Sequence, residues 1–247
     1  MYTVNIFWAI TGAGCCLRDL AGFFQDLARV GHRVTIGLSL WGYRVARIYG
    51  VLPVLRRIAD GSYYRELLVG DQGFYYTGRF NLGRYGLAVI APATGNSVAK
   101  MALGIADTLP TLVFAEAGKS GVPVVVYPSD HLGPDGYAVS EAPCMIDREK
   151  CTCIDETGYC PAMDACPVDA IVLVSGKPRI DLSKCTGCEA CVKACIHGAV
   201  KCWEKVSVKP RRIDLLNIEK LKEFRNVYVA DSLEELKRLV AGLIGDG

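Results

Sequence analysis

The placement of the cysteines constrains this chain of 247 residues more than any other feature. Eight of the 12 cysteines lie between Cys151 and Cys195, and Cys144 and Cys202 flank that stretch. The first nine residues lack the basic segment of a signal peptide, so we expect a cytoplasmic protein in a reducing compartment. Under those conditions metal binding explains a dense cysteine cluster better than a disulfide framework does.

The last four of these eight cysteines have C-x2-C-x2-C-x3-C spacing, which runs from Cys185 to Cys195. In such a run three thiolates bind one cubane cluster, while the fourth is carried onward to a different cluster. The upstream pair Cys166-Pro167 resembles the Cys-Pro that ends this run in bacterial ferredoxins, and it supplies the missing ligand. A structural zinc site is the alternative, but zinc takes four ligands and this stretch offers eight. The predicted ligands of a first 4Fe–4S cluster are Cys166, Cys185, Cys188 and Cys191.

A second 4Fe–4S cluster is predicted from the less regular half of the same stretch. Residues 146–151 repeat the pattern of residues 180–185, so Cys151 begins a second half of an internal repeat. The crossover of the fourth cysteine assigns Cys195 to this cluster, and Cys144 stays open as a replacement for one of its partners. The predicted ligands are Cys151, Cys153, Cys160 and Cys195.

Strands and helices alternate along the rest of the chain, which indicates an α/β protein with a doubly wound, mostly parallel sheet. Apolar runs predict strands at 2–10, 32–39, 87–91 and 123–127, and amphipathic segments predict helices at 17–30, 43–59, 98–106 and 109–117. A strand at 226–230 and a helix at 233–243 follow the cysteines and most simply complete the same sheet. We therefore expect three segments: 1–143 as an α/β domain, 144–205 as an inserted ferredoxin-type module, and 206–247 as the end of the first domain.

Small and polar residues follow three of the predicted strands. Gly12 and Gly14 let backbone N–H groups approach a phosphate at a helix N-terminus, although a tight turn without a ligand explains them equally well. Ser39 ends the second strand, and the cluster Thr94–Ser97 opens the next helix, where N-capping is the simpler interpretation. All three groups map to the carboxyl edge of the sheet, where ligands of such folds bind.

The segment 91–109 closely resembles a motif of the homo-oligomeric flavin-containing cysteine decarboxylase superfamily, which binds FMN between subunits. This resemblance implies FMN as the cofactor and a homo-oligomer, either a trimer or a multiple of one. Two features depart from it: residues 61–86 contain no His, and residues 128–131 read Pro-Ser-Asp-His where a substrate-clamp motif belongs. Decarboxylase chemistry is therefore not expected. Carried over by position, the flavin contacts are Gly12, Ala13, Gly14, Ser39, Thr94, Asn96 and Ser97.

The combination with a ferredoxin segment resembles the archaeal flavoproteins that include dihydromethanopterin reductase (acceptor). It implies an oxidoreductase that passes electrons from a redox donor, such as a ferredoxin, through the clusters and FMN to a small-molecule acceptor such as a dihydropterin. The alternative is an adaptor that shuttles electrons between a ferredoxin and a partner oxidoreductase; a pocket over the flavin would distinguish the two. The 28 Lys and Arg nearly balance 26 Asp and Glu, and no apolar run approaches the ~20 residues of a membrane span, so neither a nucleic-acid partner nor a membrane is expected.

Four further features have both a functional and a structural interpretation. Cys15 and Cys16 could form a redox pair, but small residues at a helix start are the simpler explanation. His131 follows a strand end and is a candidate to face the flavin, whereas His32 is expected to be structural. The segment 70–85 is either a lid over the flavin or an ordinary surface loop. A basic run at 209–212 is expected to be solvated surface.

Overall fold

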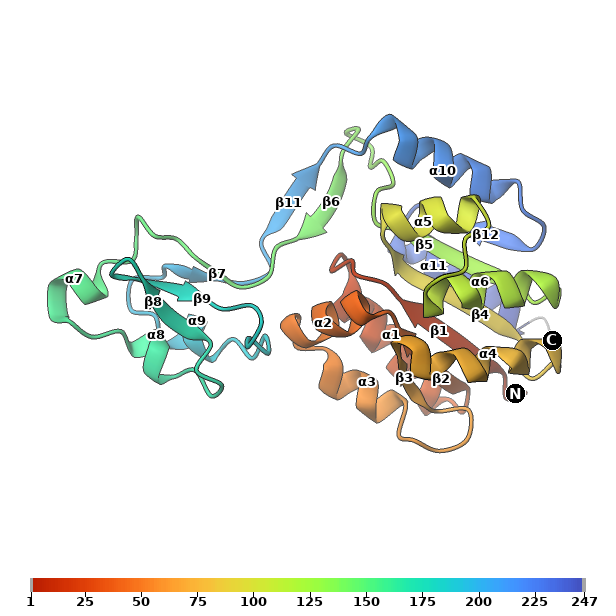
Figure 1. Ribbon diagram of the computed structural model, residues 1–247, viewed down its shortest axis with the longest axis horizontal. Coiled ribbons are helices and arrows are strands. Elements are labelled where there is room, and N and C mark those ends of the chain that lie inside the picture. Colours follow the sequence, from red (N-terminus) through yellow and green to blue (C-terminus); the bar gives the residue numbers. More distant parts are fainter. Residues whose placement is uncertain (1, 246–247) are drawn as a thin grey trace.

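A computed structural model of the chain describes residues 2–245. It consists of an α/β domain and a smaller cysteine-rich module beside it, and a two-stranded neck connects the two (Figure 1). No helix within residues 2–245 is long and apolar enough to cross a lipid bilayer.

The α/β domain is built on a six-stranded sheet in which every strand is parallel to its neighbours. The strand order β12-β5-β4-β1-β2-β3 reverses direction between β1 and β4, which is where ligands bind in doubly wound sheets. In register, Asn5 of β1 lies opposite Arg33 of β2, and Ile6 lies opposite Leu87 of β4. The predicted fold class is confirmed. The strands are β1 (Asn5–Ile10), β2 (Arg33–Leu38), β3 (Leu67–Val69), β4 (Leu87–Ala93), β5 (Val124–Pro128) and β12 (Val227–Val229).

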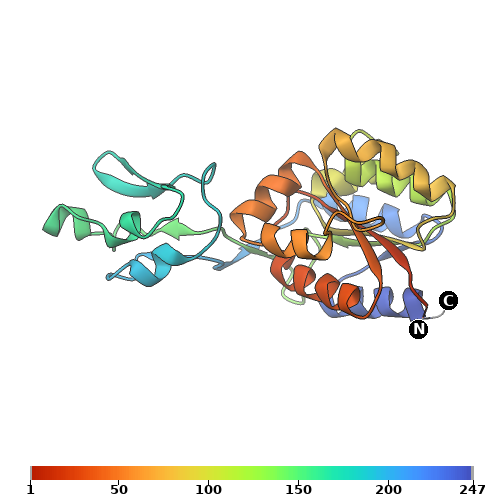
Figure 2. The same ribbon diagram turned by 90° about the horizontal axis from the view of Figure 1, so that it is seen from below.

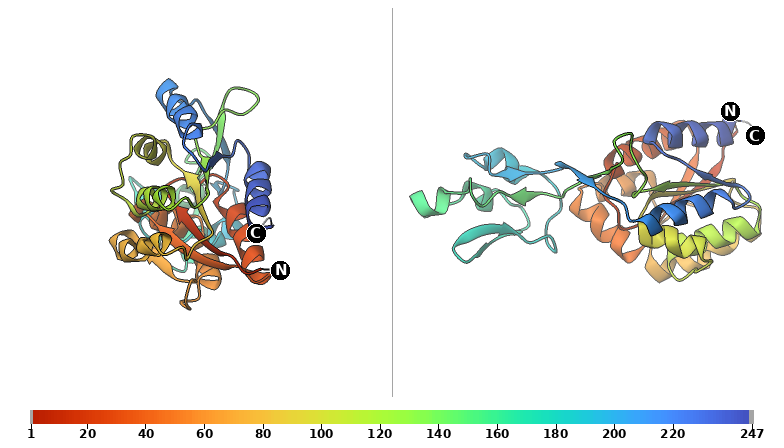
Figure 3. Two further views of the ribbon diagram at one scale, coloured as in Figure 1. Left: turned by 90° about the vertical axis from the view of Figure 1, so that its right-hand side faces the viewer. Right: turned by 90° about the horizontal axis from the view of Figure 1, so that it is seen from above.

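Helices cover both faces of the sheet (Figure 3). Side chains of β1 alternate between the two layers: Trp8 packs on one face, with its ring stacked 4.1 Å from that of Phe24, and Phe7 packs on the other. The layer with Trp8 contains α1 (Leu17–Arg29), α2 (Leu40–Ile48), α3 (Leu52–Ile58) and α11 (Leu233–Gly245). The layer with Phe7 contains α4 (Phe74–Asn81), α5 (Gly95–Ala102), α6 (Leu109–Lys119) and α10 (Arg212–Lys222).

The C-terminal strand and helix return to the α/β domain, so the cysteine-rich module is an insertion in it. Val227 of β12 pairs with Val124 of β5, and α11 packs on the same strand. The neck is the antiparallel pair β6 (Ala138–Glu141) and β11 (Lys205–Val208), which carries the chain out and back. The predicted boundaries at 143/144 and 205/206 fall at or beside this neck and stay predictions.

The module itself is small and has little regular structure. Its sheets are the hairpin of β8 (Ile171–Val174) with β9 (Lys177–Ile180) and the short pair of β7 (Met145–Ile146) with β10 (Val200–Lys201). Its helices are α7 (Cys153–Thr157), α8 (Pro161–Asp164) and α9 (Ala190–Ala194). Helix α7 lies at the end of the module farthest from the α/β domain, and α2 lies on the side of the domain that faces the module (Figure 2).

Candidate functional site

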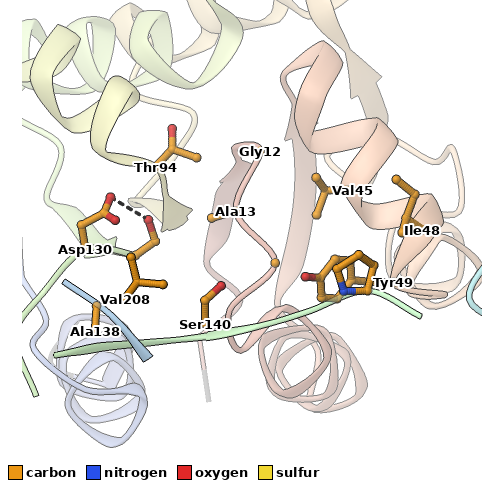
Figure 4. Close-up of a pocket in the computed structure, with 13 residues that line it drawn as sticks. Gly12, Ala13, Val45, Ile48, Tyr49, Thr94, Asp130, Ala138, Ser140 and Val208 are labelled. Atoms are coloured by element: carbon orange, nitrogen blue, oxygen red, sulfur yellow. Dashed lines mark hydrogen bonds between the residues drawn. The ribbon is translucent and has the colours of Figure 1, made fainter. Parts of the chain in front are cut away.

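Two cavities lie at the carboxyl edge of the sheet and share Gly12 and Thr94 as lining residues. The first has a volume of about 460 Å³ and lies between the turn after β1, helix α2 and the neck (Figure 4). The second has a volume of about 420 Å³ and is bounded by the turns after β2 and β4 and by the start of α6. Both cavities therefore occupy the topological switch point between β1 and β4.

The structure brings all seven predicted flavin contacts to these cavities. Gly12, Ala13 and Gly14 line the first, and Thr94 lines both. The second cavity is lined by Gly12, Ser39, Thr94, Asn96 and Ser97. The two adjoining cavities thus bring together residues that lie more than 80 positions apart in the sequence.

Thr11, which sequence reasoning missed, joins the two turns that both cavities share. Its buried hydroxyl donates to the carbonyl oxygen of Pro92 at 2.7 Å and accepts from the N–H of Thr94 at 2.9 Å. The N–H of Thr11 also donates to the Pro92 carbonyl at 3.3 Å. Thr11 therefore fixes the end of β1 against the end of β4 and sets the spacing between Gly12 and Thr94.

Three helices begin at the wall of the second cavity. The hydroxyl of Ser39 caps α2 by accepting from the N–H of Gly42 at 2.9 Å, and the hydroxyl of Thr94 caps α5 by accepting from the N–H of Ser97 at 3.3 Å. Thr108, which begins α6, lines the same cavity. Because each helix N-terminus carries partial positive charge and free N–H groups, their convergence suits an anionic group such as a phosphate.

The wall of the first cavity contains four polar residues that were not predicted: Tyr49, Ser129, Asp130 and Ser140. Asp130, just after β5, accepts from the N–H of Gly95 at 2.8 Å and so holds the start of α5. Burial raises the pKa of Tyr49 to about 12, and its hydroxyl donates to the carbonyl of Glu141 in the neck. Ser140 comes from the neck itself. Asp130 could have been predicted as a site residue, because it directly follows a strand of the sheet. Nothing in the sequence indicated that α2 and the neck would meet at this cavity.

Five cysteines of the module line a third cavity. One is Cys144, and the other four are the predicted ligands of the first cluster: Cys166, Cys185, Cys188 and Cys191. The sulfur of Cys166 accepts from the N–H of Ala170 at 3.2 Å, and that of Cys185 from the N–H of Gly187 at 3.5 Å. Backbone N–H groups aimed at sulfur are what thiolates of an iron–sulfur cluster require, so this donor set fits the predicted group.

The other four predicted ligands form a separate group. Burial raises the pKa of the Cys151 thiol, and the neighbouring Cys153, Cys160 and Cys195 raise it further. In the first group, burial raises the pKa of Cys191 to about 11, with further contributions from Cys185 and Cys188. The neighbouring thiols that raise each pKa therefore belong to the same predicted set of four, and the assignment of these sets to two clusters stays a prediction.

Cys144, which the sequence left open as a ligand, is bonded to Cys202 in a disulfide across the base of the module. It is therefore not free to replace Cys151, Cys153 or Cys160. Within residues 2–245, no three His, Cys, Asp or Glu side chains are gathered closely enough to hold a single metal ion.

Cys15 and Cys16 are both free thiols. Burial raises the pKa of Cys15, and Cys16 lies at the start of α1 with its sulfur 3.6 Å from the hydroxyl of Tyr127. These positions agree with the structural interpretation. His32 is buried and accepts from the N–H of Val4, so it is also structural.

Neither interpretation of residues 70–85, a lid over the flavin or an ordinary surface loop or β-hairpin, describes most of that segment. Residues 74–81 form α4, which packs on α6 because Phe80 is fully buried in the core on that face of the sheet. Arg79 forms an ion pair with Glu66 at 2.9 Å and stacks on Tyr63, away from both flavin cavities. Only Gly70 and Asp71 reach the second cavity.

His131 lines neither of the two flavin cavities; its Nδ1 lies 2.8 Å from the carbonyl oxygen of Pro128. In the basic run, the guanidinium of Arg211 binds the carboxylate of Asp214 at 2.7 Å. The hydrogen bonds from Arg211 hold the pKa of Asp214 below its usual range. This pair stabilises the start of α10 and lines neither of the two cavities at the sheet edge.

Comparison with known proteins agrees with this geometry. The family described as Flavoprotein matches residues 2–137, and the family described as 4Fe-4S binding domain matches residues 178–201. A Methanosarcina mazei protein named dihydromethanopterin reductase (acceptor) is 36% identical over 95% of this chain and 98% of its own length. A Methanocaldococcus jannaschii protein of the same name is 37% identical over 92% of this chain and 91% of its own length.

Among solved structures, the chain is similar to Burkholderia xenovorans DmrB in complex with FMN, described as a cubic protein cage for redox transfer. The TM-score is 0.62 at 24% identity, with 98% of this chain and 96% of that chain covered. A dodecameric FMN-dependent UbiX-like decarboxylase from Escherichia coli O157:H7 has a TM-score of 0.52 at 12% identity, covering 98% and 93% of the two chains. At these identities the likeness establishes the shared fold.

Proposed function

Since this chain belongs to the flavoprotein family and is an oxidoreductase with flavin and iron–sulfur domains, we propose that it reduces a dihydropterin such as dihydromethanopterin, using FMN and two 4Fe–4S clusters. The observation that carries this proposal is the juxtaposition of two features. One is a pair of adjoining cavities that share Gly12 and Thr94 at the switch point of the sheet, and the other is a module that gathers the predicted cluster ligands Cys166, Cys185, Cys188 and Cys191 around one cavity.

The two cavities suit different parts of FMN. The phosphate belongs in the second cavity, where the helices that begin at Ser39, Thr94 and Thr108 present their N-termini. The flavin ring belongs in the first cavity, against the glycine turn 12–14 and beside Tyr49. When bound there, FMN supplies the conversion between one-electron and two-electron transfer, while the protein binds it, orients it and excludes water.

The electron balance of the reaction is simple. A low-potential donor of the ferredoxin type gives one electron at a time, and two electrons with two protons reduce one C=N bond of the pterin ring. Because the flavin ring would occupy the first cavity, the preference for a small-molecule acceptor over the adaptor hypothesis rests on the two relatives named dihydromethanopterin reductase (acceptor). Structural relatives are described as a cage and a dodecamer, and we propose a homo-oligomer here as well.

The test begins with anaerobic purification and measurement of iron, sulfide and FMN for each chain. We expect about eight irons and one FMN, because each cubane contains four irons. The reduced protein is then mixed anaerobically with dihydromethanopterin and the flavin absorbance is followed. Reoxidation of the flavin with formation of the tetrahydropterin supports the proposal. A flavin that stays reduced, in protein with full cofactor content, would contradict the substrate assignment.

A further inference from the structure

The two groups of cysteines differ in their distance from the flavin cavities. We propose that the cluster bound by Cys166, Cys185, Cys188 and Cys191 is the one that exchanges electrons with the flavin. The cluster bound by Cys151, Cys153, Cys160 and Cys195 is the outer one and receives electrons from the donor. This inference rests on the proposed function, since it needs both clusters and FMN.

The first argument is a backbone contact between the loop of the inner cluster and the α/β domain. Gly187, between Cys185 and Cys188, has φ +63°, and a Cβ atom there would lie 2.7 Å from the nitrogen of Gly50. Gly50, just after α2, has φ +68°, and a Cβ atom there would lie 2.8 Å from the carbonyl oxygen of Gly187. Neither position has room for a side chain, so the two backbones touch directly.

Polar contacts surround this glycine pair. The guanidinium of Arg47 donates to the carbonyl oxygen of Ser183, two residues before the first ligand of the loop. Arg18 of α1 lies 3.6 Å from Glu189, the residue directly after Cys188. The indole N–H of Trp203 donates to the same Glu189 carboxylate at 2.5 Å. The contacts of Arg47 and Arg18 hold the loop of residues 183–189 against α2 and α1, and Trp203 ties the same loop to the chain that enters β11.

Tyr49 connects this contact to the first flavin cavity. It directly precedes Gly50, lines the cavity, and fills the space that a side chain at Gly14 would need. Its ring lies 5.0 Å from that of Trp203, centroid to centroid. A continuous packed path therefore leads from the inner cysteine loop through Gly50 and Tyr49 to the glycine turn at Gly14.

Within residues 2–245, no comparable backbone contact joins the loops of the outer group to the α/β domain. Cys153 begins α7, which lies at the far end of the module in each view (Figures 1 and 2). With both clusters and FMN bound, this placement would give each electron the order donor, outer group, inner group and flavin site. Two electrons, with two protons from water, would be needed to reduce FMN fully.

The docking contact is tested with Gly50→Ala, whose methyl group would push the loop at Gly187 away. Gly121→Ala is the matched control, because Gly121 also follows a helix C-cap, has φ +70°, and has open space around its Cβ position. Hydrogen exchange of residues 183–189 and the rate of flavin bleaching after mixing with reduced ferredoxin are measured. We expect faster exchange and slower bleaching in Gly50→Ala alone. Equal behaviour of the two variants would overturn the docking argument.

The order of the clusters is tested with Cys188→Ser and Cys153→Ser, each of which removes one ligand from one group. The readout is the spin relaxation of the one-electron-reduced flavin, which a nearby reduced cluster accelerates. We expect the acceleration to be lost in Cys188→Ser and kept in Cys153→Ser, and the reverse result would overturn the assignment. Purified wild-type protein without iron or without FMN would instead overturn the proposed function, and this inference with it.

Discussion

Replacing Thr94 with valine tests whether the two cavities form one flavin site. The substitution keeps the size and β-branching of the side chain and removes only the hydroxyl. That hydroxyl accepts from the N–H of Ser97 at 3.3 Å and donates to the Ser97 hydroxyl at 3.1 Å. Thr94 lines both cavities, so its hydroxyl is also available to the ligand.

The expected magnitude has two parts. Loss of an N-cap hydroxyl costs about 1 kcal/mol of stability, which applies to the folded protein with or without ligand. Loss of one hydrogen bond to FMN costs a further ~1 kcal/mol of binding free energy. Since 1.4 kcal/mol corresponds to a factor of ten, the dissociation constant for FMN should rise about fivefold to tenfold.

The assay is an anaerobic titration of flavin-free protein with FMN, followed by quenching of flavin fluorescence, together with urea unfolding. Ser232→Ala is the matched control, because the hydroxyl of Ser232 accepts from the N–H of Glu235 at 3.0 Å at the start of α11, away from both cavities. We expect both variants to lose similar stability and only Thr94→Val to lose affinity. An unchanged dissociation constant for Thr94→Val, or an equal loss for Ser232→Ala, would refute the reasoning.

Three further predictions follow from the same contacts. Cys160→Ser should lower the iron content from about eight to about four per chain while FMN is kept, as measured by metal analysis; a loss of all iron would contradict the separation into two groups. Cys144→Ser removes the disulfide to Cys202, which closes a loop of 58 residues, so the module should lose up to about 4 kcal/mol of stability and limited proteolysis should cut the neck faster. Asp214→Asn should cost about 1 to 2 kcal/mol at neutral pH. Because Arg211 depresses the pKa of Asp214 in the folded state, that stability is present above the unfolded pKa near 4 and disappears as the pH falls through the folded pKa, so unfolding curves of variant and wild type should converge in acid.

The sequence predicted the strands and helices of the α/β core well because their signals are local. The expected strand at residues 32–39 and helix at 17–30 agree with β2 and α1 to within one residue at each end. The expected helix at 43–59 is two helices, α2 and α3, and the chain breaks between them near Gly50. Pro53 does not cause the break, because proline is accepted in the first turn of a helix, where it lies in α3. The expected start of a helix at Val98 was three residues late, because Thr94 is its N-cap.

Elements with weak periodicity were missed. β3 has only three residues and lies at the edge of the sheet, and α4 is a mixture of glycine and aromatic residues that gives no clear amphipathic pattern. α10 follows the basic run and was not predicted at all. Each of these elements is stabilised by packing against distant parts of the chain, and a local pattern does not report such contacts.

The sequence by itself predicted the cysteine ligands and the polar turns that follow the strands. The spacing of the cysteines and the order of the strands are properties of short segments, and they predicted both groups of cysteines and the glycine and threonine turns of the flavin cavities. Only the tertiary structure decided how these parts lie relative to one another. The neck returns the module to α2, and Gly187 touches Gly50 across 137 positions of sequence. Such a contact depends on two surfaces fitting without side chains between them, and no periodicity along a single chain encodes that fit.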